Sequence, residues 1–362
     1  MKISRTKRWL FPINRLAAGL YGLGVRLRLW LYRLHLLPIR RLPLKVISIG
    51  NLTAGGTGKT PHAALLANYL KKGGIKTAVL SRGYRGTKMK QGAIISDGIS
   101  VSGTLEEGGE EPYWLAQKLP GIPVVVGKDR YRSGMLCFHK WQTEWVVLDD
   151  GFQHLCLERE IDILLLPGHR PFDSGRLLPL GFLREPINEM RRADMVLITH
   201  AERLDFSQRE EVAKEIRSRI PSTPVFFSEH KPMILWFYSN KKEVPLSWLA
   251  GKQVVGFCGL ADPESLAFSL KQIGADMVKL VEFPDHHFYQ EKDKRSLETL
   301  SRSLKINLLV TTEKDALKLG EWETADLHIL VLGIEAEVLD AGFWELLDQN
   351  IRQEARGIQH EA

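Results

Sequence analysis

After Pro43 the chain alternates short apolar runs with longer stretches in which apolar residues recur at helical spacing. The apolar runs have the length of strands and lie at 45–49, 77–80, 123–126, 145–148, 161–166 and 195–199. Continuous apolar runs are typical of strands buried on both faces, and the stretches between them suit right-handed crossover helices. The pattern predicts an α/β fold built on a parallel, doubly wound sheet.

The pattern changes near Pro224. Residues 224–227 and 233–238 are two β-prone runs, and the residues 229–232 between them are typical of a turn. Further runs at 253–257, 277–282, 308–312 and 327–332 begin a second alternation of strands and helices. We therefore expect three consecutive parts: a basic segment at 1–43, a larger α/β domain at 44–222, and a smaller α/β domain at 223–362 that begins with a short β connection.

Residues 8–45 are rich in leucine and aromatic residues, but Arg15, Arg26, Arg28 and Arg33 interrupt them. The uncharged stretch 16–25 is well short of the about 20 residues that cross a bilayer. At ~100° per residue, Arg15, Arg26 and Arg33 fall on one narrow stripe of a helix. We expect an amphipathic helix that associates with the surface of a membrane containing anionic lipid. The alternative is a helix packed on the core of its own domain.

The composition restricts the class of protein and the kind of partner. The chain has 362 residues, of which 44% are hydrophobic and 26% charged, and this is typical of a globular protein. Its net charge of +7 is uneven, because 19 Lys and Arg residues and no Asp or Glu precede Asp97. Such an imbalance favours a local anionic partner over a nucleic acid. The three scattered cysteines favour a reducing, cytosolic setting.

A glycine-rich loop directly follows the first buried run. It reads Thr-Ala-Gly-Gly-Thr-Gly-Lys-Thr over residues 53–60, and a helical pattern follows it. Backbone N–H groups in such a loop converge on phosphate oxygens, and the new helix directs its unpaired amides at the same anion. Lys59 is expected to reach the β- and γ-phosphates of ATP and Thr60 to bind Mg²⁺. The nucleotide-binding residues are therefore Thr53, Ala54, Gly55, Gly56, Thr57, Gly58, Lys59 and Thr60.

Carboxylates follow two other predicted elements. The run at 145–148 is followed by Asp149 and Asp150. We expect Asp149 to serve the metal, directly or through water, and Asp150 to orient either Lys59 or the water shell of the metal. Glu110 and Glu111 open a predicted helix, where carboxylates often only complement the helix dipole. In the last part of the chain, Pro-Asp-His-His-Phe-Tyr at 284–289 sets a carboxylate beside two imidazoles, a proton-relay candidate that is more often structural.

Several motifs together resemble one known family. VISIGNLTAGGTGKTP, LSRGYRG, DDGFQH, RLLPLGFLREP and TTEKDA occur in the order found in the tetraacyldisaccharide 4'-kinases of lipid A biosynthesis. The resemblance implies an enzyme that transfers the γ-phosphate of ATP to the 4'-hydroxyl of a tetraacyl disaccharide 1-phosphate. The product is the 1,4'-bisphosphate lipid A precursor. It also implies a peripheral or monotopic location at the cytoplasmic face of the inner membrane.

The resemblance also implies roles for single residues. The family motif Gly-Asp-Glu-Pro corresponds here to residues 109–112, so Glu110 takes the place of the aspartate proposed as base, and Glu111 lies near the metal. The relay histidine corresponds best to His286, with His287 a close competitor. Because Glu110 and His286 lie in different predicted domains, closure is expected before chemistry. Candidates for contacts with substrate are Arg82, Arg85, Arg176 and Arg184. The sequence does not decide whether residues 311–315 lie near the base or form a hinge between domains.

A second interpretation remains at this stage. A membrane-associated P-loop ATPase that acts as a switch or positioning module would also combine a GGTGKT loop with a basic amphipathic helix. The two differ in acceptor dependence, because a kinase consumes ATP only when a disaccharide lipid gains phosphate. A nucleic-acid-binding NTPase is disfavoured, because the cationic residues are interspersed with leucines.

Overall fold

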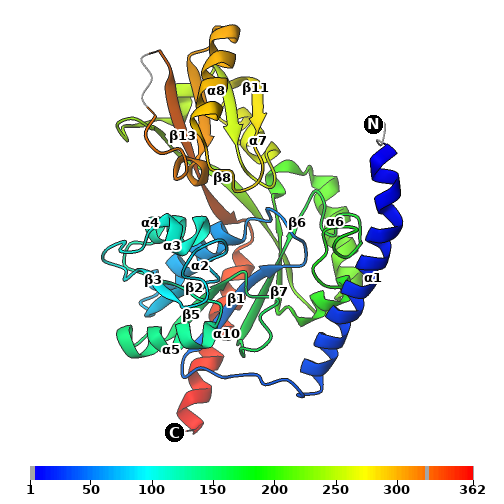
Figure 1. Cartoon of the computed structure of the whole chain (residues 1–362). Helices are drawn as coiled ribbons and strands as arrows, with labels where there is room; N and C mark the ends of the chain where they lie inside the picture. Colours follow the sequence, from blue (N-terminus) through cyan, green and yellow to red (C-terminus); the bar gives the residue numbers. More distant parts are fainter. Residues whose placement is uncertain (1–4, 323–325, 362) are drawn as a thin grey trace. The chain divides into compact units, whose positions relative to one another are not determined.

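The computed structural model describes residues 5–322 and 326–361, with the side chains of residues 14–322 and 326–354. The chain forms two compact units, each assembled from separate segments (Figure 1). The first comprises Met1–Arg82, Asp129–Glu229 and Val338–Ala362, and the second comprises Gly83–Lys128 and His230–Glu337. These units interleave along the sequence, whereas the predicted domains are consecutive, and that predicted division stays a prediction.

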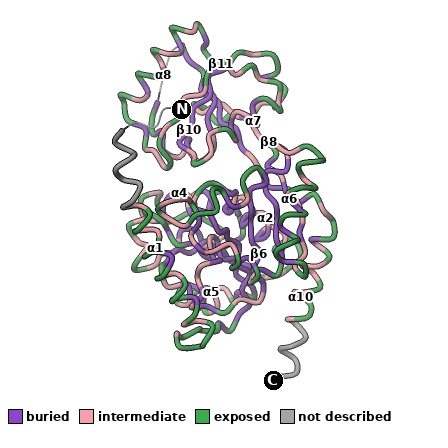
Figure 2. The backbone as a smooth tube through the Cα atoms, turned by 90° about the vertical axis from the view of Figure 1, so that its right-hand side faces the viewer, coloured by how far each residue is buried: buried purple, intermediate pink, exposed green. Residues whose placement is uncertain are grey.

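The first unit is built on a parallel sheet with the strand order β8-β7-β6-β1-β5-β2. Its strands are β1 (Lys45–Asn51), β2 (Thr77–Ser81), β5 (Trp145–Asp149), β6 (Ile161–Pro167), β7 (Met195–Thr199) and the first residues of β8 (Val225–Phe237). Every residue of β1, β2, β5, β6 and β7 is buried, as expected for strands covered on both faces (Figure 2). The predicted parallel sheet is confirmed.

The helices of the first unit connect and flank these strands. They are α1 (Arg5–Arg33), α2 (Lys59–Lys72), α5 (Arg130–Trp141), α6 (Phe206–Arg219), α10 (Ala341–Glu361) and the short 3₁₀ helices η1 (Ile187–Arg192) and η2 (Ala201–Arg203). Figure 1 shows α1 as one long helix before the first strand. None of the described helices is both long and apolar enough to cross a membrane.

The second unit carries the strand order β11-β10-β12-β13-β8, with β9 antiparallel to β8. Its strands are β10 (Gln253–Cys258), β11 (Asp276–Glu282), β12 (Leu308–Thr312), β13 (His328–Val338), β9 (Glu243–Val244) and the antiparallel pair β3 (Ala93–Ser96) and β4 (Val124–Val126). Its helices are α3 (Leu105–Gly108), α4 (Glu110–Lys118), α7 (Glu264–Gln272), α8 (Glu291–Leu304), α9 (Glu313–Ala316) and η3 (Leu246–Leu249).

Alternate residues of the central strands in this second unit enter two separate hydrophobic clusters. Val254 and Val310 belong to one cluster, whereas Val255 and Leu309 belong to the other. Successive side chains of a strand point to opposite faces, so both faces of this sheet are covered. The second strand–helix alternation is thereby confirmed.

The turn predicted at residues 229–232 is wrong, because β8 runs without interruption from Val225 to Phe237. Ser228, His230 and Pro232 are buried, while Lys231 and Met233 are exposed, so this stretch has the period of two that a strand requires. Its polar composition concealed that period. The short strands β3 and β9 were also absent from the prediction.

Candidate active site

The loop between β1 and α2 is held from several sides. Gly58, the last residue before α2, has φ 77°, a conformation that glycine adopts without strain. The Asn51 side-chain amide donates a hydrogen bond of 2.8 Å to the hydroxyl of Thr57, and the Thr199 hydroxyl at the end of β7 donates to the Thr57 carbonyl at 3.2 Å. The backbone N–H of Ala54 donates to the Phe182 carbonyl at 2.7 Å.

The predicted nucleotide-binding residues lie together in this loop and in the first turn of α2. Thr53, Thr57, Lys59 and Thr60 are buried, Ala54 and Gly58 are half-buried, and Gly55 and Gly56 are exposed at the tip. A tip of exposed glycines on a rigid base is the geometry with which backbone N–H groups contact phosphate oxygens.

Lys59 and Asp150 lie near each other. The Lys59 ammonium is 3.8 Å from a carboxylate oxygen of Asp150, and the Arg184 guanidinium is 2.9 Å from the same carboxylate. Asp150 has φ 58° directly after β5, which turns the chain sharply there. Burial opposes ionisation of Asp150, but Lys59 and Arg184 outweigh burial and lower its pKa to about 2. The carboxylate is therefore ionised and links both cations.

Asp149 ends β5 in register with Ile49 of β1, whose strand leads into the loop. Its side chain is buried and accepts a hydrogen bond of 3.2 Å from the Ser81 hydroxyl. Thr60 is buried at the beginning of α2. Carboxylate and hydroxyl oxygens are ligands that Mg²⁺ prefers, so this donor set fits the expected ion.

His62 supports the loop from the first turns of α2. Its Nδ1 donates to the Gly58 carbonyl at 2.7 Å, and its Nε2 accepts from the Ser228 hydroxyl at 2.8 Å. Burial lowers the pKa of His62 to about 4, although the Gly58 carbonyl and the charge of Glu202 oppose the shift. The neutral imidazole thus ties the loop to β8.

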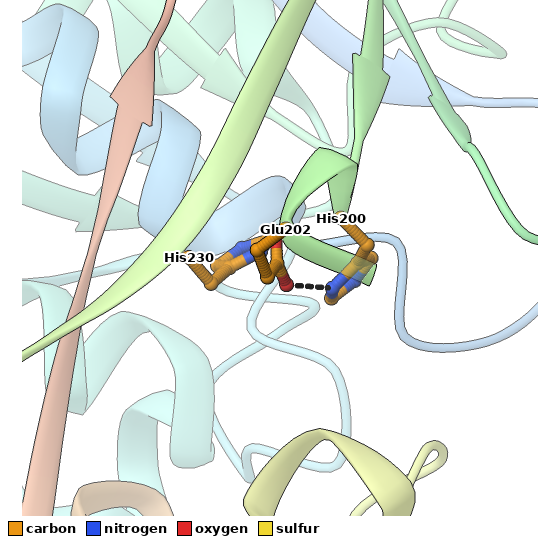
Figure 3. Close-up of side chains that lie close together, drawn as sticks. All are labelled: His200, Glu202 and His230. Carbon is orange, nitrogen blue, oxygen red and sulfur yellow. Dashed lines mark hydrogen bonds and ion pairs between the residues drawn. The ribbon is translucent and has the colours of Figure 1, made fainter. Parts of the chain in front are cut away.

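The chain after β7 forms another local contact. His200 has φ 59°, and its Nδ1 lies 3.2 Å from a carboxylate oxygen of Glu202 (Figure 3). His200 follows Thr199, whose hydroxyl contacts the phosphate loop. This contact therefore lies in the segment that carries the Thr199 hydroxyl.

Helix α1 contacts the segments that surround Asp150. The Tyr21 hydroxyl donates to the Arg184 carbonyl at 2.9 Å, and Arg28 donates to the Gln153 carbonyl at 2.8 Å. Arg33 forms a 2.6 Å ion pair with Glu189 on η1. The docked side of α1 therefore touches the chain shortly after the acidic motif and the segment that carries Arg184, the partner of Asp150.

A buried cationic group also lies near Asp150. Arg130 is 4% exposed, and burial lowers its pKa to about 10 despite the nearby Asp150 charge. Burial, together with the charges of Arg130 and Arg159, lowers the pKa of His154 to about 4. The candidate substrate residues Arg82, Arg85 and Arg176 are exposed, and Arg184 is half-buried in its contact with Asp150.

In the second unit, Glu110 begins α4 after Gly109, which has φ 84° and lies too close to the Tyr84 carbonyl for any side chain. Glu110 is 8% exposed. Its Oε2 accepts hydrogen bonds from Nδ1 of His286 at 2.9 Å and from the Lys318 ammonium at 3.0 Å. Burial works against the charged form, but His286 and the nearby lysines outweigh it and lower the pKa of Glu110. The hydrogen bond to Glu110 raises the pKa of His286, although burial opposes it.

Glu110 and His286 thus belong to the same compact unit, and the closure expected before chemistry stays a prediction. The neighbouring His287 has another environment. Its Nε2 lies 2.9 Å from a carboxylate oxygen of Asp293, and its ring stacks on Phe283 with centroids 4.9 Å apart. Of the two imidazoles left open by the sequence, the structure brings His286 to Glu110.

Glu111 lies next to Glu110 but has a different partner, the Lys314 ammonium at 3.2 Å. Lys314 belongs to α9, whose Glu313 also binds Lys118 at 2.6 Å and Trp114 Nε1 at 3.2 Å on α4. Helices α4 and α9 are therefore joined by charged contacts. The segment 311–315, left open by the sequence, lies beside Glu110.

Sequence reasoning missed three groups: His62, Arg130 and Lys318. His62 directly follows the phosphate-loop motif in a predicted helix, so a helical wheel could have placed it on the buried side. Lys318 lies three residues after Asp315, a spacing that puts two side chains on one side of a helical turn. Nothing in the local sequence marks Arg130 as buried.

The chain is similar to known proteins over most of its length. A family model described as Tetraacyldisaccharide-1-P 4'-kinase matches residues 7–352. A protein of Syntrophus aciditrophicus (strain SB) named tetraacyldisaccharide 4'-kinase is 39% identical over 325 residues, 88% of this chain and 87% of that protein. One of the same name from Pelobacter propionicus is 40% identical over 322 residues, 89% of this chain and 87% of that protein. A crystal structure of LpxK from Aquifex aeolicus in complex with ATP has a TM-score of 0.72 at 32% identity and covers 96% of this chain and 99% of that chain.

Proposed function

The chain belongs to the tetraacyldisaccharide-1-phosphate 4'-kinase family, and from this premise we propose how its residues perform the reaction. The enzyme transfers the γ-phosphate of ATP to the 4'-hydroxyl of a tetraacyldisaccharide 1-phosphate and forms the 1,4'-bisphosphate precursor of lipid A. The membership favours the kinase over the ATPase switch. The residue roles, the metal and the membrane contact that follow are our proposals.

The loop of residues 53–60 holds the ATP phosphates, and Lys59 neutralises charge that spreads over the γ-phosphate during transfer. Asp150, fixed by Arg184, keeps the Lys59 ammonium aligned. Thr60 and Asp149 would hold Mg²⁺, and the place of Glu111 near the metal stays a prediction from the family resemblance. The ion supplies positive charge to the phosphate oxygens. These assignments rest on buried oxygen donors at the beginning of α2 and the end of β5.

Glu110 is the general base, and the observation that carries this assignment is its 2.9 Å hydrogen bond to His286. A base must be ionised to accept a proton, and His286 and Lys318 stabilise the ionised carboxylate in a buried setting. The 4'-hydroxyl proton passes to Glu110 while the hydroxyl oxygen forms a bond to the γ-phosphorus. The bond from that phosphorus to the β–γ bridging oxygen breaks, and ADP leaves.

Substitutions at three positions test this assignment. Glu110→Gln should lower kcat by about 100-fold or more with little change in the KM for ATP, because general base catalysis contributes on that order. His286→Ala should have a milder effect of the same kind. His287→Ala is the matched control, since this imidazole binds Asp293 instead. Normal kcat in Glu110→Gln would move the base to another residue, and a larger loss in His287→Ala would reassign the relay.

We place the enzyme at the cytoplasmic face of the inner membrane, held by α1 within the segment 1–43. Leu16, Leu20, Leu23 and Leu27 are 52–68% exposed. At ~100° per residue they form one stripe, turned away from buried Leu29 on the docked side. Arg15 and Arg26 are exposed between these sides and suit anionic headgroups, whereas Arg33 of the predicted stripe is paired with Glu189. A helix packed only on its own core would not leave such a stripe exposed.

Vesicle flotation tests this contact. The double substitution Leu20→Ser and Leu27→Ser should release the protein from vesicles, because the apolar stripe is lost. Ile99→Ser is the matched control, since Ile99 is 96% exposed elsewhere on the chain. Arg26→Gln should weaken binding to anionic vesicles alone. Unchanged flotation of the double variant would refute the membrane role of α1.

The exposed arginines Arg82, Arg85 and Arg176 remain candidates for contacts with the disaccharide lipid or its phosphate. A guanidinium binds phosphate through two parallel hydrogen bonds, so exposure is the accessible state that such a role needs. The Arg85 guanidinium lies over the Tyr84 ring at 5.6 Å, which limits its freedom. Arg184 acts instead through Asp150 in our proposal.

A further inference from the structure

Lys318 lies in the turn after α9 and is completely buried, with 0% of its side chain exposed. Its ammonium has two carboxylate partners, Oε2 of Glu110 at 3.0 Å and Oδ1 of Asp315 at 3.2 Å. A lysine is almost never fully buried unless it is paired, because its charge loses hydration. The position of this ammonium is therefore set by the two carboxylates.

Asp315 is itself fixed from three directions. Its Oδ1 accepts hydrogen bonds from the Gly259 N–H and the Tyr289 hydroxyl, each at 3.0 Å. Its Oδ2 accepts from the Thr312 hydroxyl at 2.7 Å. These donors come from the end of β10, the segment before α8 and the end of β12. A carboxylate with both oxygens occupied cannot rotate, so Asp315 is a rigid anchor for Lys318.

The two oxygens of Glu110 are not equivalent. His286 and Lys318 both donate to Oε2. Among the residues that the structure describes, none donates a hydrogen bond to Oε1. Two donors on one oxygen fix the carboxylate plane and leave the other oxygen as the acceptor for a proton.

Lys318 and His286 approach the same oxygen of Glu110 from different segments. The charged and titratable groups near Glu110 are Glu111 on α4, Asp285 and His286 after β11, Tyr289 before α8, and Lys314, Asp315 and Lys318 at α9. Of the two donors to Oε2, Lys318 is also held by the Asp315 carboxylate at 3.2 Å. The direction from which Lys318 donates to Glu110 is therefore fixed.

We propose that Lys318, anchored by Asp315, is a positioning residue that fixes the plane of the Glu110 carboxylate and leaves Oε1 open to the acceptor hydroxyl. The inference rests on the proposed role of Glu110 as base. It assigns a purpose to a buried ion pair that would otherwise only join α9 to α4. A purely structural pair would affect stability but would leave the kcat of the folded protein unchanged.

The test compares kcat and the KM for ATP in the wild type, Lys318→Met and Lys318→Arg at one fixed pH. Lys318→Met has similar length but cannot donate to Oε2 of Glu110, so its kcat should fall about tenfold while its KM for ATP stays within about twofold. Lys318→Arg keeps a donor and should restore most of kcat. A Lys318→Met variant with the kcat of the wild type overturns the proposal.

Two further variants keep the outcome decisive. If Lys318→Met does not fold, Asp315→Asn replaces it, because an amide keeps the shape but holds the ammonium less tightly. It should lower kcat in the same direction by a smaller factor, and an unchanged kcat overturns the proposal. Glu110→Gln separates the proposed base from the proposed role of Lys318. Normal turnover in Glu110→Gln removes the base itself, whereas an inactive Glu110→Gln with normal kcat in Lys318→Met removes only the role of Lys318.

Discussion

Replacing His62 by glutamine should remove a loss of stability that the wild-type protein undergoes as the pH falls from 7 to 5. The His62 imidazole is 1% exposed and lies between the Gly58 carbonyl and the Ser228 hydroxyl. Burial lowers its pKa from the ordinary histidine value of 6.5 to about 4. The unfolded chain therefore binds a proton near pH 6.5, and the folded chain does not bind it until about pH 4.

The sign and size of the effect follow from this difference. A group that binds its proton more readily in the unfolded chain stabilises that chain as the pH falls, so stability is complete above pH 6.5 and is lost towards pH 4. Each unit of pKa difference corresponds to about 1.4 kcal/mol. Between pH 7 and pH 5 the free energy of unfolding should fall by about 2 kcal/mol through His62 alone.

Urea denaturation of wild type and His62→Gln at pH 7 and pH 5 measures this quantity. The readout is the difference between the two proteins, because His154, with a pKa of about 4, adds its own loss to both. Glutamine can still donate to the Gly58 carbonyl but does not titrate. His139→Gln is the matched control, since His139 is exposed. If His62→Gln loses as much stability as the wild type, the imidazole is not buried and neutral as described.

Other predictions concern the first unit. Gly50→Ala should lower the free energy of unfolding by about 2 kcal/mol, because the new Cβ would lie 2.5 Å from a phenylalanine Cβ. Gly24→Ala is the control, because a Cβ added at Gly24 would have no atom within 4 Å. Equal melting temperatures of the two variants would contradict the close packing at Gly50. Arg184→Gln should raise the pKa of Asp150 and lower kcat about tenfold by loosening the phosphate-loop lysine. Arg191→Gln is the control and should leave kcat unchanged, because Arg191 is exposed. An unaltered kcat in Arg184→Gln would show that Arg184 does not contribute to catalysis.

Much of the fold could be predicted because local pattern and burial agree in its central strands. The run 145–148 is apolar at each position, and the structure buries it in β5 between β1 and β2. The strand β8 could not be predicted in full, because its buried residues include the polar Ser228 and His230. A hydropathy pattern predicts which apolar side chains are buried, but it does not identify a polar side chain that is buried with hydrogen-bond partners.

The candidate site could also be predicted only in part. Residues 53–60 form a continuous motif, so the chain itself brings them together. Glu110, His286 and Lys318 are far apart in sequence, and only the folded chain places their side chains within hydrogen-bonding distance. The choice between His286 and His287 depends on a left-handed backbone at His286, φ 61°, which adjacent residues do not reveal.

The central claim is that the loop around Lys59 directs the γ-phosphate of ATP to a disaccharide lipid. Transfer of radiolabel from γ-labelled ATP to a tetraacyldisaccharide 1-phosphate, measured for wild type and Lys59→Ala with Mg²⁺ present, tests it most directly. We expect label at the 4' position with the wild type and none above background with Lys59→Ala. Equal labelling by the two proteins, or release of labelled phosphate without a labelled lipid, would contradict the account.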